Sequence, residues 1–235
     1  MNKKITIAID AMGGDNAPTK TMMGVKIFLD RNKFEDFKLD LYGDKTKISN
    51  ELHKLNISSK HISVIHTDSV VSDEETPLTA IKNSKNTSMW KCINSQREGV
   101  SDISLSAGNT GVLLVISRMI LKMMSKVGKP ALAGLWPNQN GMNVVLDLGA
   151  NIECDENNLV DFAELGSALY KSLYPNDQPL VSLLNIGSEE IKGTEVLKKT
   201  YKKLNELSNE NNFIFKGYIE GNRIMKGETN IIVTD

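Results

Sequence analysis

Short turns of small polar residues follow four apolar segments of this 235-residue chain. They are DAMGGDNAP at 10–18, SAGNTG at 106–111, DLGAN at 147–151 and NIGSEEIKG at 185–193. Glycine and alanine let backbone amides approach a ligand closely, and serine, threonine and asparagine add short polar groups. One such turn is typical of a tight bend or a helix cap. Four together predict a site for a small anion such as phosphate.

The turn at 106–111 is the strongest candidate for the anion site, because a predicted helix begins near Thr110 and would point its positive end at a ligand there. The turn is neither a GxGxxG nor a Walker loop, so neither a dinucleotide nor a nucleoside triphosphate is predicted. The candidate binding residues are Gly13, Gly14, Asp15, Asn16, Ser106, Ala107, Gly108, Thr110, Gly111, Asp147, Asn151, Asn185 and Gly187.

The presence of aspartates in turns predicted to bind phosphate has to be explained, since carboxylates repel phosphate. Asp10, Asp15 and Asp147 are expected to cap or orient their neighbours, in preference to holding a metal ion. No metal site is predicted.

A phosphate site also needs a cation. Lys192 lies inside the fourth turn and is the preferred partner, with Lys82 and Lys85 as the other available lysines. The candidate catalytic residues are therefore Lys192, Asn109 and Asp10, with Asp10 fixing loops and donors and attacking nothing.

Familiar nucleophilic arrangements are missing from the sequence. The three histidines fall outside the four turns, and neither HExxH nor GxSxG occurs. Cys92 and Cys154 have no histidine nearby in the sequence. This pattern favours chemistry in which the substrate brings its own nucleophile.

Strand and helix patterns alternate along the chain, which predicts a doubly wound, mostly parallel α/β sheet with all four turns at one edge. We expect residues 1–235 to form a single α/β domain. Strands are expected at Ile5–Ile9, Leu39–Tyr42, Ile62–His66, Ile103–Ser106, Val144–Leu146, Val181–Leu184, Phe213–Phe215 and Ile231–Val233. Helices are expected at Thr19–Arg31, Lys45–Leu55, Pro77–Asn83, Ser88–Glu98, Thr110–Lys126, Leu159–Leu173 and Glu195–Leu207.

Composition narrows the class of protein further. The chain is 40% hydrophobic and 24% charged, with a formal net charge of -1, so no basic field indicates a nucleic-acid partner. Two separate cysteines suit a reducing compartment. The longest apolar run is interrupted by Arg118 and Lys122, and a strand pattern begins too early for a signal peptide. We expect a cytoplasmic protein, with peripheral membrane contact left open.

The four turns in this order, with TPLTAIKNSKNTSM at 76–89, resemble the bacterial phosphate acyltransferase (PlsX) family from Ile5 to Asp235. The resemblance implies a fold like isocitrate and isopropylmalate dehydrogenases and phosphotransacetylase. It implies transfer of a long acyl chain from acyl-acyl carrier protein to inorganic phosphate, giving acyl phosphate for phospholipid synthesis. It also implies a homodimer that passes its product to a membrane-bound glycerol-3-phosphate acyltransferase, and no cofactor.

The sequence departs from the family pattern in two places. The family continues past Asp235 with a glycine-rich turn and a helical region that contributes to dimer packing and membrane contact, which predicts that this chain is truncated and its site incomplete. Residues 82–85 read KNSK, where the family has a denser basic cluster. Two alternatives remain open: a phosphotransacetylase-like enzyme using acyl-coenzyme A, and a non-catalytic module that binds phosphate or acyl carrier protein.

Overall fold

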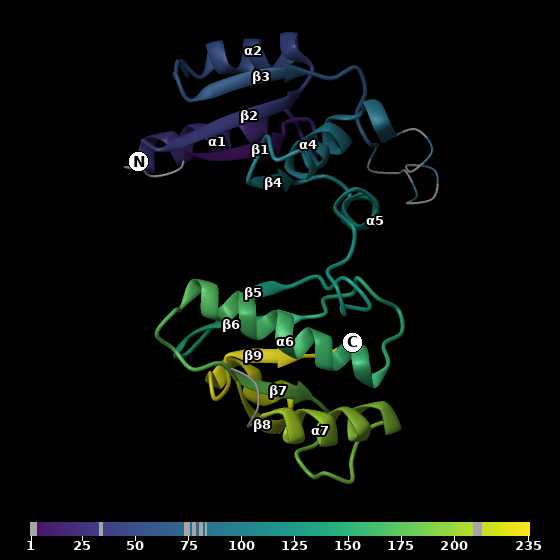
Figure 1. The fold of residues 1–235 in the computed structure, drawn as a ribbon. Coiled ribbons are helices and arrows are strands. Elements are labelled where there is room, and N and C mark those ends of the chain that lie inside the picture. Colours follow the sequence, from purple (N-terminus) through teal and green to yellow (C-terminus); the bar gives the residue numbers. More distant parts are fainter. Residues whose placement is uncertain are drawn as a thin grey trace. The chain divides into compact units, whose positions relative to one another are not determined.

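The computed structural model describes residues 4–32, 35–72, 76, 79, 82, 84–208 and 213–235. Contacts divide the chain into two compact units, Met1–Lys122 and Met123–Asp235, where we expected a single domain. Each unit has its own sheet (Figure 1).

The first unit is built on four parallel strands in the order β3-β2-β1-β4. Its elements are β1 (Ile5–Asp10), α1 (Thr19–Arg31), β2 (Phe37–Gly43), α2 (Lys45–Lys54), β3 (Ile62–His66), the 3-10 turn η1 (Ser84–Asn86), α4 (Ser88–Arg97), β4 (Ile103–Ser106) and α5 (Thr110–Leu121). Alternate residues of the strands point to opposite faces. Leu39 and Leu41 therefore pack with Met22 of α1 and Ile48 of α2, whereas Ala8 packs with Cys92 of α4.

The second unit is built on a five-stranded sheet in the order β5-β6-β9-β7-β8, parallel except for the β5–β6 pair. Its elements are β5 (Gly134–Asn138), β6 (Gly141–Leu146), α6 (Glu156–Leu173), β7 (Leu180–Leu184), α7 (Glu195–Leu207), β8 (Ile214–Ile219), the 3-10 turn η2 (Gly221–Lys226) and β9 (Ile231–Val233). Leu159 and Phe162 of α6 pack on Val144, Ile231 and Val233 of the sheet. Ile224 of η2 packs with Ile232 on the other side of β9.

The two sheets confirm the mostly parallel α/β fold, but they correct the prediction that all four turns lie at one sheet edge. The turns after β1 and β4 belong to the first sheet, and those after β6 and β7 belong to the second. Sequence patterns identify strands, but parallel partners are chosen by long-range burial, which the patterns do not encode.

Smaller differences have local causes. The helix that begins at Thr110 ends at Leu121 instead of Lys126, because Lys122 has φ +67°, outside the helical region. Strand β5 was not predicted, since its sequence GLWPN has no strand alternation. The helix expected at Pro77–Asn83 lies mostly outside the described residues. In the described part of the chain, no helix is long and apolar enough to cross a membrane.

Candidate functional site

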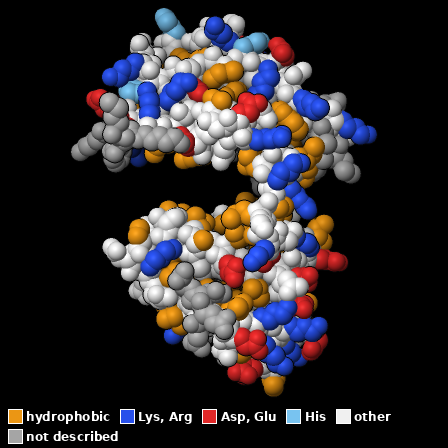
Figure 2. Space-filling model, viewed as in Figure 1, with side chains coloured by type: hydrophobic (Ala, Val, Ile, Leu, Met, Phe, Trp, Pro, Cys, Tyr) orange, Lys and Arg blue, Asp and Glu red, His pale blue; other side chains and the backbone are white. Residues whose placement is uncertain are grey.

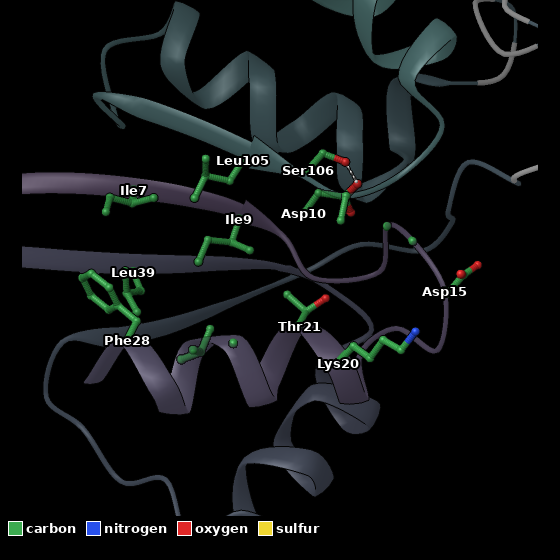
Figure 3. Close-up of a pocket in the computed structure, with 15 residues that line it drawn as sticks. Ile7, Ile9, Asp10, Asp15, Lys20, Thr21, Phe28, Leu39, Leu105 and Ser106 are labelled. Carbon is green, nitrogen blue, oxygen red and sulfur yellow. Dashed lines mark hydrogen bonds between the residues drawn. The ribbon is translucent and has the colours of Figure 1, made fainter. Parts of the chain in front are cut away.

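The turns after β1 and β4 meet at a junction of two side chains. Strands β1 and β4 pair in parallel with Asp10 opposite Ser106, so both turns leave the sheet at the same level. The Ser106 hydroxyl donates a hydrogen bond of 2.7 Å to Oδ2 of Asp10 (Figure 3), and accepts one of 3.1 Å from the Gly108 N–H. We call this contact the Asp10–Ser106 junction.

Glycine makes the close approach of the two turns possible. A Cβ atom at Gly13 would lie 2.5 Å from Oδ2 of Asp10 and 2.9 Å from the amide nitrogen of Gly108. Gly14 has φ +87°, and a Cβ there would lie 2.5 Å from the carbonyl oxygen of Ala107. Both positions therefore require glycine, for lack of space and, at Gly14, also for backbone conformation.

Asp10 is turned toward its neighbours, with only 2% of its surface exposed. Burial raises the pKa of the Asp10 carboxyl, against the opposing effect of the hydroxyls of Ser88 and Ser106 and the N–H groups of Met12 and Gly13. The Met12 N–H donates to Oδ1 at 3.3 Å. This geometry suits the predicted task of fixing loops, because the carboxylate holds both turns and also faces α4.

The second turn leads directly into α5. Asn109 is the N-cap of this helix, and its side-chain oxygen accepts a 3.1 Å hydrogen bond from the Val112 N–H. Thr110 and Gly111 are exposed in the first turn of the helix, as are Asp15 and Asn16 in the other loop. The helix N-terminus and the two turns thus meet at one place on the first unit, as expected of an anion site.

A pocket of about 610 Å³ lies beside the junction. Its wall is mostly apolar and includes Ile7, Ile9, Phe28 and Leu105, which project from β1, α1 and β4 (Figure 3). Figure 3 shows the polar side chains gathered toward one end, namely Asp10, Asp15, Lys20, Thr21 and Ser106. Gly13, Gly14 and Ala107 also line the pocket. Lys20 and Thr21 were not predicted from the sequence; their position in the first turn of the helix after DAMGGDNAP was the available signal.

The turn after β6 is organised by a second buried aspartate. Asp147 is 2% exposed and accepts hydrogen bonds from the N–H groups of Leu132 at 2.7 Å and Asn151 at 2.8 Å. The Asn151 amide donates to the same carboxylate at 3.0 Å and to the carbonyl of Pro130 at 2.8 Å. Asp147 and Asn151, which were both predicted as binding residues, are therefore hydrogen-bonded to each other and stabilise the turn after β6.

The turn after β7 is closed by Asn185 and carries the exposed Lys192. The Asn185 side chain accepts from the Ile186 N–H at 2.9 Å and donates to the Lys192 carbonyl at 3.2 Å. The Lys192 ammonium lies 2.9 Å from Glu189, and this pairing lowers the pKa of the Glu189 carboxyl. Gly187 lies within the same turn, and a Cβ there would lie 2.9 Å from Nζ of Lys192.

The two turns of the second unit are not neighbours in the sheet, because β9 lies between β6 and β7. All three strands run parallel, so their carboxyl ends share one edge. The structure thus brings the predicted residues of the turns after β1 and β4 together, and it places the other two turns separately at one edge of the second sheet.

Residues 5–235 match the family described as "Fatty acid synthesis protein". The chain belongs to the fatty acid synthesis protein family. A phosphate acyltransferase of Pelagibacter ubique is 53% identical over 235 residues, which cover 100% of this chain and 69% of the relative. One from Parvibaculum lavamentivorans is 41% identical, covering 100% of this chain and 64% of the relative. The chain therefore spans about two thirds of the length of these curated relatives, and the resemblance seen in its motifs is confirmed.

The fold of this fatty acid synthesis protein is similar to that of solved phosphotransacetylases. The enzyme from Streptococcus pyogenes aligns with a TM-score of 0.68 and 13% identity, over 99% of this chain and 78% of that one. The EutD phosphotransacetylase of Staphylococcus aureus aligns with a TM-score of 0.64 and 14% identity, over 98% and 77%. At these identities the likeness concerns the fold alone.

The donor set of this family member is poor in metal ligands. Among the described residues, no three His, Cys, Asp or Glu side chains gather to hold a metal ion. Asp10 and Asp147 each accept hydrogen bonds both from their own turn and from a neighbouring segment of the chain. Among the described residues, the groups available to a ligand are backbone amides, hydroxyls and lysines, which suit an anionic ligand.

Proposed function

We propose that this chain is the acyl-transferring part of a phosphate acyltransferase, which moves a long-chain acyl group from acyl-acyl carrier protein to inorganic phosphate. The observation that carries the proposal is the Asp10–Ser106 junction, which holds two glycine-rich turns and a helix N-terminus together. Membership of a family whose curated relatives are named phosphate acyltransferase supports it.

The chemistry needs no protein nucleophile. A phosphate oxygen attacks the thioester carbonyl carbon, the carbonyl oxygen becomes an oxyanion, and the C–S bond breaks to release the carrier thiolate. Phosphate is already anionic near neutral pH, and a thiol of pKa about 8.5 is a good leaving group. The protein must therefore hold phosphate against the carbonyl and stabilise the oxyanion. In the first unit we assign these tasks to the turn amides and Asn109, with Asp10 as the residue that positions the turns. In the second unit we propose Lys192 as a phosphate-binding residue.

The pocket beside the junction supports an acyl substrate. Its volume of about 610 Å³ lies within the range of roughly 300–1,000 Å³ that is usual for ligand pockets. Its wall is apolar, and its polar groups are gathered at the end formed by the two turns. A substrate with a long apolar chain and one reactive polar end matches this distribution.

The family resemblance also underlies the proposed partners. Acyl carrier protein is the proposed donor, and a membrane-bound glycerol-3-phosphate acyltransferase is the proposed recipient of the acyl phosphate. A second copy of the chain completes a homodimer, located in the cytoplasm with peripheral membrane contact. Surface charge over α7 is mixed, as Figure 2 shows in the second unit, with pairs such as Lys198–Glu195 and Lys203–Glu156.

The decisive measurement is phosphate-dependent release of the carrier thiol from a long-chain acyl-acyl carrier protein. It should be made on this chain and on the chain joined to the part of the Pelagibacter relative that it does not match. Release by either form, strictly dependent on phosphate, supports the proposal. Release only from acyl-coenzyme A would support the phosphotransacetylase-like alternative. Phosphate binding without release from either donor would support the binding module.

Two substitutions test the assigned residues in whichever form is active. Asn109→Ala and Lys192→Ala are each expected to reduce turnover by about tenfold or more, because each removes a group to which the proposal assigns the stabilisation of negative charge. Asn109→Ser keeps a cap for α5 but lacks the amide, so it separates capping from catalysis. Lys198→Ala is the control for Lys192, since Lys198 pairs with Glu195 in the same i,i+3 spacing. Full turnover in both alanine variants would exclude the assignment.

A further inference from the structure

We propose that Lys20 is a further substrate-binding residue, which contacts the phosphate group of an acyl phosphate while the acyl chain lies against the apolar wall of the same pocket. The inference rests on the proposed function and deepens it, because it assigns a cation and an orientation of the ligand to the first unit. Lys20 was not predicted from the sequence as a binding residue, and Lys192, the cation assigned above, belongs to the second unit.

Lys20 borders the pocket at its polar end. It lies in the first turn of α1 and lines the pocket together with Asp10 and Ser106. Figure 3 shows its side chain extending from α1 toward the turn that carries Asp15. The Lys20 N–H donates a 3.2 Å hydrogen bond to the carbonyl of Asn16, which fixes the backbone of the lysine beside that turn. The lysine and the Asp10–Ser106 junction therefore border the same space.

The Lys20 ammonium is available to a ligand. Lys20 is exposed, and in the part of the chain that the structure describes its ammonium makes no salt bridge. Lys192 and Lys198, by contrast, lie 2.9 Å and 3.0 Å from glutamate carboxylates. A paired lysine must lose its partner before it can bind phosphate, whereas Lys20 can form a charge-assisted hydrogen bond to phosphate without that loss.

The end of α1 that carries Lys20 lacks negative charge. The first turn of the helix holds no acidic residue, and the N-cap, Pro18, makes no side-chain hydrogen bond to the helix. In α2, by contrast, the Asp44 carboxylate accepts hydrogen bonds from the N–H groups of Thr46 and Lys47. Anions stabilise the positive end of a helix, and a lysine at that end adds to the positive charge. A phosphate group at the polar end of the pocket offsets both.

Two carboxylates line the same end of the pocket, and the charge of each is reduced by its surroundings. Asp10 is 2% exposed, and its oxygens accept hydrogen bonds from the Ser106 hydroxyl and the Met12 N–H. Asp15 is exposed, so water and salt screen its charge. The remaining repulsion of a phosphate group is what a lysine at this position counteracts.

One side of α1 leads from the lysine to the apolar wall. Lys20, Gly24 and Phe28 line the pocket at intervals of four residues, which places them on the same side of the helix. Eight residues of helix rise about 12 Å, so Lys20 and Phe28 lie about that far apart along the pocket. A Cβ added at Gly24 would meet nothing within 4 Å, so the space between them is open. Leu105 of β4 lines the same pocket and is 50% exposed, so an alkyl chain there would bury apolar surface.

The first test is calorimetric titration with decyl phosphate, a stable alkyl mimic of an acyl phosphate, and with decanol, its neutral counterpart, both below the concentration at which micelles form. Lys20→Ala is expected to weaken binding of decyl phosphate about tenfold or more, because a charge-assisted hydrogen bond is lost, and to leave binding of decanol unchanged. Lys20→Arg should restore most of the affinity for decyl phosphate. A purely structural role for Lys20 would change the binding of both ligands alike.

A second variant tests the position of the alkyl chain. Gly24→Leu places an apolar side chain in the open space beside Lys20, and leucine favours a helix more than glycine does, so the fold should be retained. This variant is expected to weaken binding of decyl phosphate and of decanol, each by about tenfold or more, because the leucine occupies the path of the chain.

Lys45→Ala is the matched control. Lys45 is also an exposed lysine in the first turn of a helix, α2. This variant should bind both ligands as the unmodified chain does. Because both lysines are exposed, Lys20→Ala and Lys45→Ala should keep the thermal unfolding midpoint of the unmodified chain.

Four results would each overturn the inference: unchanged binding of decyl phosphate in Lys20→Ala, an equal loss in Lys45→Ala, full binding by Gly24→Leu, or no binding of decyl phosphate by the unmodified chain. If Lys20→Ala loses decyl phosphate but no form of the protein transfers an acyl group, the assignment of Lys20 stands and the proposed function falls. If acyl transfer occurs while binding of decyl phosphate does not depend on Lys20, the proposed function stands and this inference falls.

Discussion

Replacement of Asp10 by alanine is expected to lower the free energy of unfolding of the first unit by about 3 kcal/mol and to reduce acyl transfer below detection. The substitution leaves the Ser106 hydroxyl and the Met12 N–H without their buried acceptor, and each unsatisfied buried donor costs about 1–3 kcal/mol. Urea unfolding followed by tryptophan fluorescence measures the loss. A Trp136→Phe background leaves Trp90 of α4 as the reporter for the first unit.

Asp10→Asn is the matched control, because it keeps the size and one acceptor oxygen but does not titrate. Burial raises the pKa of Asp10 above its ordinary value of 3.8 in the folded state. Between that value and the raised one, the folded chain retains a proton that the unfolded chain has released, so the contribution of Asp10 to stability falls as pH rises. The stability of Asp10→Asn relative to the unmodified protein should therefore increase with pH through this window and then level off. Parallel pH profiles for the two proteins would contradict the assigned environment.

Replacement of Gly14 by alanine is the second change with a large expected effect. Its φ of +87° strains a residue with a side chain by roughly 1–2 kcal/mol, and the added Cβ would lie 2.5 Å from the backbone oxygen of Ala107. The turn after β4 cannot move away from the added Cβ without displacing Ser106 and the start of α5. We expect a loss of about 2–4 kcal/mol in stability, together with loss of phosphate binding, measured by urea unfolding and phosphorus NMR.

Gly24→Ala provides the control for the glycine experiment. Gly24 lies within α1, and a Cβ there would meet nothing within 4 Å. Alanine favours the helix over glycine by about 0.5–1 kcal/mol, so this variant should be slightly more stable than the unmodified protein. If Gly14→Ala behaved like Gly24→Ala, the close contact of the two turns would not be needed for the fold.

The elements themselves could be read from the sequence because their signals are local. The apolar runs of β1, β7 and β9 are three to six residues long, and α1 and α7 were predicted with the bounds that the structure has. The polar turns were also visible, since glycine, asparagine and serine mark strand ends wherever the strands are placed. Strand β5 was not predicted, because Trp136, Pro137 and Asn138 show no alternation of apolar and polar residues.

The pairing of the elements was decided only by the tertiary structure. A parallel strand pairs with residues far away in sequence, and several neighbours satisfy the same apolar pattern. Hence β9 lies between β6 and β7, and the four turns divide between two sheets. The partner of Asp10 has the same origin, because Ser106 lies 96 positions further along the chain. The residue types at each strand end are a property of the sequence, but their partners depend on long-range burial, which no local pattern records.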